Sequence, residues 1–169
     1  MILSIFFVPL VHCQPVVTIS DVIDYQKGKM IVSFILNKEP DTPFYGYAFR
    51  IDYDSTVLSK PTYLKKGTIS ENSNILFSST PCDNFGKITI SSYDLQSDTG
   101  GVLIKLVFDI NQDKKNTKSN IEFIDKNLRT VLFKAGFEKV STLFNNKTFT
   151  IKQFDLKYLI QIFKKISSY

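Results

Sequence analysis

The stretch TPFYGYAFRIDYDSTVLSK, residues 42–60, carries large apolar side chains at alternate positions and then turns into an acidic segment. The apolar residues are Tyr45, Tyr47, Phe49, Ile51 and Tyr53. The small or charged residues between them are Gly46, Ala48, Arg50 and Asp52. Successive side chains of a β-strand point to opposite faces. The alternation therefore predicts a strand whose apolar row fills the core between two sheets, with Arg50 and Asp52 facing water.

Short alternating segments with turn-like breaks recur along the rest of the chain. They are 16–22, 29–36, 74–80, 86–93, 101–110, 119–125, 129–133 and 143–152. In the segment 101–110 one side is wholly apolar, formed by Val102, Ile104, Leu106, Phe108 and Ile110. With the opening stretch, about nine short strands result, a number typical of two packed antiparallel sheets. The sequence predicts an all-β fold, an about nine-stranded jelly-roll β-sandwich over 16–152.

Both ends of the chain differ from this pattern. In the tail QFDLKYLIQIFKKISSY, 153–169, apolar residues fall at helical spacing, which predicts a C-terminal amphipathic helix. The first thirteen residues, MILSIFFVPLVHC, form a short apolar run of the kind found in secretion signals. LVHC also resembles a lipoprotein box, in which Cys13 would be acylated. We expect 1–13 to be a signal peptide or lipoprotein signal, and the protein to be secreted or at the cell surface.

Charge and composition argue against several functions. The net charge is +5, of which the tail from Lys152 onward supplies +3 through four lysines and one aspartate. The body lacks the basic stripe typical of nucleic-acid binders, so no nucleic-acid partner is expected. The chain has one histidine, His12, and it lies in the predicted leader. The body therefore has no imidazole for catalysis. No phosphate-binding, dinucleotide or zinc motif occurs. We therefore predict a protein that is not an enzyme and has no cofactor or metal.

Four segments of the body resemble the cohesin domain family in their order and spacing. They are FRIDYDSTVLS (49–59), GKITISSYD (86–94), GVLIKLVFDI (101–110) and LFNNKTFTIK (143–152). The resemblance runs from Val16 to Lys152. It implies a jelly-roll sandwich on a secreted or surface scaffold that holds the dockerin modules of enzymes through one sheet face.

The resemblance also implies which residues form that face. They are the outward positions of three strands: Gly46, Ala48 and Arg50, then Thr89, Ser91 and Tyr93, then Leu103 and Lys105. Cohesins that bind dockerins commonly carry polar hydrogen-bonding residues where this chain has Gly46 and Ala48. A smooth face with Leu103 and Tyr93 is instead expected to accept a partner by apolar contact.

The predicted function is that of a non-catalytic, monomeric binding module that attaches to a protein partner of dockerin type. One alternative is a carbohydrate-binding module whose partner is a polysaccharide, which needs a planar row of exposed aromatic rings. The absence of Trp and the inward phase of most Tyr residues argue against it. A further alternative is a lipid-anchored structural envelope protein, attached to the membrane through Cys13 or the C-terminal helix.

Overall fold

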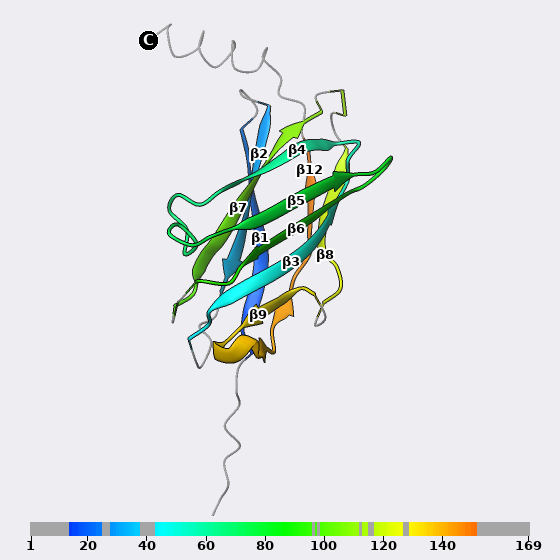
Figure 1. Ribbon diagram of the computed structural model, residues 1–169. Coiled ribbons are helices and arrows are strands. Elements are labelled where there is room, and N and C mark those ends of the chain that lie inside the picture. The colour runs from blue at the N-terminus through cyan, green and yellow to red at the C-terminus, as the bar shows by residue number, and fades with distance from the viewer. Residues whose placement is uncertain are drawn as a thin grey trace, which may run out of the picture.

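The computed structural model describes residues 14–24, 28–37, 43–95, 97, 99–111, 113–114, 117–126 and 129–151. The predicted leader, Cys13 and the predicted helix at 153–169 lie outside the described residues. Two sheets face one another, one in front of the other in the view of Figure 1. The prediction of an all-β sandwich is therefore confirmed.

One sheet has five strands and the other has seven. The five-stranded sheet has the order β11 (Leu143–Phe144), β1 (Val16–Asp24), β2 (Lys29–Leu36), β7 (Gly101–Ile110) and β4 (Leu58–Leu64). The main path of the seven-stranded sheet is β10 (Lys139–Val140), β9 (Val131–Phe133), β3 (Gly46–Tyr53), β6 (Gly86–Ser92) and β5 (Leu76–Pro81). Its other two strands are β8 (Lys118–Phe123), which pairs with β3, and β12 (Lys147–Thr150), which pairs with β8. A 3-10 turn, Ala135–Phe137, follows β9.

The inner row of β3 forms the centre of the core. Tyr47, Phe49 and Ile51 are fully buried and Tyr53 is nearly so. The Phe49 ring lies 5.7 Å from that of Phe34 on the opposite sheet, and it stacks on Tyr47 at 4.6 Å. Aromatic contacts of this kind add to the stabilisation from burial. The alternation in the opening stretch thus predicted four of its five core residues.

Tyr45 is the exception, because its side chain is 37% exposed. The regular strand begins only at Gly46, and the residue buried just before it is Phe44, whose backbone exchanges two hydrogen bonds with Ser97. The prediction that Tyr45 lies in the core is wrong because the alternation does not extend back beyond the start of the strand.

The described residues form twelve strands against the predicted nine, for three reasons. The two-residue strand β10 lies between the predicted segments 129–133 and 143–152. The segment 143–152 contains β11 and β12, which lie in different sheets. In addition, β4 contains Pro61, and its pairing with β7 shifts between Ser59 and Thr62. Proline removes a ladder donor and is tolerated on edge strands such as this one. This irregular edge strand lacks the alternation on which the sequence prediction depends.

A small polar contact ties the two sheets together within the core. The hydroxyls of Tyr47 and Ser70 lie 3.0 Å apart, and Ser70 donates a hydrogen bond to the carbonyl oxygen of Leu103 at 2.6 Å. Burial raises the pKa of Tyr47 well above its usual range, although the bond to Ser70 opposes the shift. The contact fixes β3 relative to β7 through groups that are all satisfied.

Candidate functional site

The outer side of the seven-stranded sheet is called here the β3 face. Its strands run in the order β8, β3, β6 and β5, so the side chains form cross-strand rows. The residues of the β3 face are Ala48, Arg50, Asp52, Leu76, Ser78, Thr80, Lys87, Thr89, Ser91, Asn120 and Glu122. The face is polar or small at most positions, but Leu76 is 65% exposed.

Five of the predicted partner-binding residues come together on this side of the molecule. Ala48 pairs directly with Ser91, and Arg50 with Thr89. Tyr93 follows β6 immediately and is exposed. The sequence prediction of this part of the surface rested on alternation in two strands that prove to be neighbours.

The structure places Leu103 and Lys105 elsewhere, on β7 in the five-stranded sheet. Phe34 pairs with Ile104 and Ile35 with Val102, so Leu103 is the extra residue of a β-bulge. A bulge re-aims side chains, and Leu103 is fully buried instead of facing outward. The prediction that these two residues share a face with Ala48 is therefore corrected.

Arg50 is held at the middle of the β3 face. Its guanidinium donates a hydrogen bond to Asp125 Oδ2 at 2.9 Å, and the backbone of Arg50 contacts the buried Thr130 hydroxyl. Thr130 Oγ1 also donates to the carbonyl oxygen of Ile124 at 2.5 Å. These contacts order one cation next to a surface of small side chains.

Asp52 lies in the adjacent row, between Lys87 on β6 and Glu122 on β8. Its Oδ1 atom is buried and has no hydrogen-bond partner among the described residues. Loss of hydration raises the pKa of Asp52 above its usual 3.8; Lys87 opposes this shift, while Glu122 and Asp125 add to it. Like charges directly opposite one another destabilise a sheet. A cationic group placed here would relieve both the missing contact and the repulsion.

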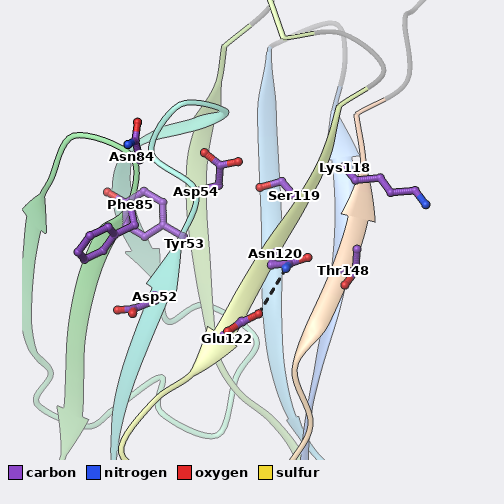
Figure 2. Close-up of a pocket in the computed structure, with 10 residues that line it drawn as sticks. All are labelled: Asp52, Tyr53, Asp54, Asn84, Phe85, Lys118, Ser119, Asn120, Glu122 and Thr148. Carbon is purple, nitrogen blue, oxygen red and sulfur yellow. Dashed lines mark hydrogen bonds between the residues drawn. The ribbon is translucent and has the colours of Figure 1, made fainter.

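A depression of about 570 Å³ adjoins this row at the end of β3, as Figure 2 shows. Among the described residues its lining includes three carboxylates, from Asp52, Asp54 and Glu122, and one cation, Lys118. Asn120 donates a hydrogen bond to Glu122 Oε1 at 3.3 Å, drawn as the dashed line in Figure 2. The described lining therefore carries an excess of negative charge, which suits a basic side chain.

Two other kinds of site are absent from the described residues. Within these ranges no group of three or more His, Cys, Asp or Glu residues is arranged to hold a metal ion. Nor does any helix in the described part of the chain have the length and apolar character needed to cross a membrane. Cys82 is a half-buried free thiol.

Sequence reasoning missed the contributions of β5 and β8. Leu76, Ser78 and Thr80 belong to the β3 face because β5 pairs with β6, and Asn120 and Glu122 belong because β8 pairs with β3. Alternation within each segment indicated which side chains share a side of one strand. It carried no information on which strands are neighbours.

The family model described as "Cohesin domain" matches residues 15–151. The chain therefore belongs to the cohesin domain family. No curated protein sequence matches it significantly.

Solved structures show the same fold at low sequence identity. The chain is similar to a Clostridium acetobutylicum cohesin, solved in complex with a dockerin, with 16% identity, a TM-score of 0.64, and 82% of this chain and 100% of that chain covered. It is also similar to a Clostridium thermocellum cohesin from a cohesin–dockerin complex, with 18% identity and a TM-score of 0.63 over 80% of this chain and 97% of that chain. A non-cellulosomal cohesin from the archaeon Archaeoglobus fulgidus is similar with 14% identity and a TM-score of 0.58, over 88% of this chain and 98% of that chain.

Proposed function

We propose that this chain is a non-catalytic module that binds a protein partner of dockerin type through the β3 face. Membership of the cohesin family supports this function, as do the relatives solved in complex with dockerins. The observation that carries the proposal is the unpartnered Oδ1 atom of Asp52 beside Glu122, next to the small side chains of Ala48, Thr89 and Ser91. Such a surface admits a helix at close range and offers it a charge to pair with.

The centre of the face decides how a partner is held. Gly46 and Ala48 offer no side-chain hydrogen bonds, so side-chain polar recognition shifts along β3 to Arg50, Asp52 and their neighbours. Leu76, on β5 beyond β6, and Tyr93, beside β9, are both exposed and supply apolar contact. The expected complex is thus apolar over Ala48 and Ser91 and charge-paired over Asp52.

Several features of the proposal concern the chain outside its described part. The proposed organisation is an export leader at 1–13, the binding domain at 16–152 and an amphipathic tail at 153–169. Secretion or display at the cell surface, with or without acylation of Cys13, gives such a module access to extracellular partners. Labelling of Cys13 by a fatty acid distinguishes a lipid anchor from simple cleavage.

The test of the proposed function compares two matched substitutions, one on each sheet. The full chain and its variants are titrated with dockerin modules encoded in the same genome, and the dissociation constants are measured by calorimetry. At least one module is expected to bind. Ala48→Arg should weaken that binding about 100-fold or more, because the long side chain blocks the centre of the contact.

The control is Ser20→Arg, at an exposed position of β1 in the five-stranded sheet. It should leave the affinity unchanged, and circular dichroism should show both variants folded. Failure of every dockerin module to bind, or equal weakening by the two substitutions, would contradict the proposal.

A further inference from the structure

A second hollow lies beyond β9, at the opposite end of the β3 face from the acidic depression. This hollow, called here the end pocket, has a volume of about 300 Å³. Its lining includes Gly46, the rings of Tyr93, Phe133 and Phe137, and Lys134. Figure 1 shows the 3-10 turn that carries Phe137 beneath β9, at one end of the sandwich.

The rings of the end pocket contact one another but are only partly covered. The ring centroids of Tyr93 and Phe133 are 5.9 Å apart, and that of Phe137 lies 6.2 Å and 6.4 Å from the same two rings. Tyr93 is 45% exposed and Phe137 is 69% exposed. Leaving this much aromatic surface in water forgoes stabilisation that burial would provide. The rings meet at 37°, 59° and 76°, so they form a cup and not a flat platform for sugar rings.

The backbone around the end pocket has two unusual features. Gly136 and Phe137 both have positive φ angles, 73° and 59°, a conformation that is unfavourable for a residue as bulky as Phe. A Cβ atom on Gly46 would lie 2.2 Å from the carbonyl oxygen of Ser92, so only glycine fits at this position. Phe137 thus departs from its local backbone preference, which is typical of functional positions.

The end pocket is continuous with the β3 face. Phe133 pairs with Gly46, and the next row of the sheet contains Val131, Ala48 and Ser91. The positive charge of Lys134 is balanced, because its Nζ atom forms an ion pair with Glu138 at 2.7 Å. The surface therefore changes along β3 from apolar at Gly46 to acidic at Asp52.

The distance from the apolar end of β3 to its acidic end indicates how long a bound helix would be. Asp52 lies six positions after Gly46, which corresponds to roughly 20 Å along a strand. A helix of about 13 residues spans that distance. A partner helix lying along β3 thus has room for one apolar and one basic contact at its two ends.

We propose that the end pocket is an anchor subsite for a large apolar side chain at one end of the partner's helix, whose other end places a lysine or arginine over Asp52 and Glu122. The inference rests on the proposed function, since the helix belongs to the protein bound by the β3 face. It adds a contact beyond that face and assigns a direction to the bound helix.

The first test examines the pocket without any partner. Indole serves as the probe of an apolar side chain, and amide shifts of the labelled full chain are followed by NMR during the titration. Saturable shifts are expected at Gly46 and Gly136, and Phe137→Ser should abolish them. Leu64→Ser, at an exposed leucine of the five-stranded sheet, is the matched control and should leave them intact. Unsaturable shifts, or shifts that survive Phe137→Ser, overturn the anchor subsite.

The second test uses the dockerin module identified by the Ala48 experiment. Phe137→Ser should weaken its binding about 10-fold or more, mainly by faster dissociation. Loss of binding in Ala48→Arg together with unchanged binding in Phe137→Ser overturns the anchor subsite alone and leaves the proposed function standing. If no dockerin module binds, both the proposed function and the helix direction are overturned.

Discussion

The outer sides of the two sheets differ in how their polar groups are satisfied. On the five-stranded sheet, Asp109 of β7 forms ion pairs with Lys29 of β2 and with Lys60 of β4, the latter at 3.9 Å. No Phe or Tyr faces outward there among the described residues. On the seven-stranded sheet, Asp52 keeps a buried oxygen without a partner, and aromatic rings stand in solvent at one end.

The two outer sides therefore differ in whether their charges are paired and their aromatic rings are covered. Charges paired across neighbouring strands and a lack of exposed rings give the five-stranded sheet an outer side suited to water. The β3 face retains an electrostatic cost at Asp52, and the end pocket next to it leaves the Phe137 ring in water. The proposed partner would relieve both. The comparison therefore favours the β3 face as the proposed binding side, on grounds that involve no relative.

The largest expected effect separates the inner from the outer side of β3. Phe49→Ala should lower the free energy of unfolding by about 3–5 kcal/mol, because it removes the ring at the centre of the aromatic core. Denaturant unfolding followed by far-UV circular dichroism measures the change.

The matched control is the next residue of the strand. Arg50→Ala removes an outward side chain and one partly exposed ion pair, so it should cost only about 0–1 kcal/mol. A loss as large as that of Phe49→Ala would show that the β3 face is part of the stabilising framework and not a free surface.

A smaller effect with opposite signs should distinguish the carboxylates of the two outer sides. Asp109→Asn breaks an ion-paired group and should lower stability by about 0.2–1 kcal/mol. Asp52→Asn removes an unsatisfied charge facing Glu122 and should raise stability at neutral pH by up to about 1 kcal/mol.

The effect of Asp52→Asn should depend on pH. The pKa of Asp52 is raised in the folded state, so the folded protein binds this proton more tightly than the unfolded chain does. The cost of the charge is absent below the ordinary value of 3.8 and appears as the pH rises through the folded pKa. Unfolding titrations at pH 3 and pH 7 should show an advantage of the variant only at pH 7. An advantage that is equal at both pH values would contradict this cause.

The sequence was sufficient for the regular part of the fold. Alternation in β3 predicted the buried row from Tyr47 to Tyr53, since a strand with one face in the core imposes that pattern on its residues. It failed where the backbone departs from the regular strand. Tyr45 precedes the strand, Leu103 lies in a bulge, and Pro61 interrupts β4 at the sheet edge.

The binding surface was only partly predictable for a different reason. Ala48, Arg50, Thr89 and Ser91 were found because two alternating strands happen to be neighbours. Glu122 was missed, because its place opposite Asp52 depends on long-range pairing between β8 and β3. The end pocket depends in addition on the left-handed backbone at Phe137, which no residue pattern indicates.

Hydroxyl-radical footprinting of the side chains, with and without the bound dockerin module, tests the central claim most directly. Each sheet carries exposed side chains that report on its outer side: Leu76 and Tyr93 for the β3 face, Leu64 and Leu143 for the five-stranded sheet. Binding should slow the oxidation of Leu76 and Tyr93 several-fold and leave that of Leu64 and Leu143 unchanged. Protection of Leu64 and Leu143 with Leu76 and Tyr93 unprotected would place the partner on the other sheet and contradict the account.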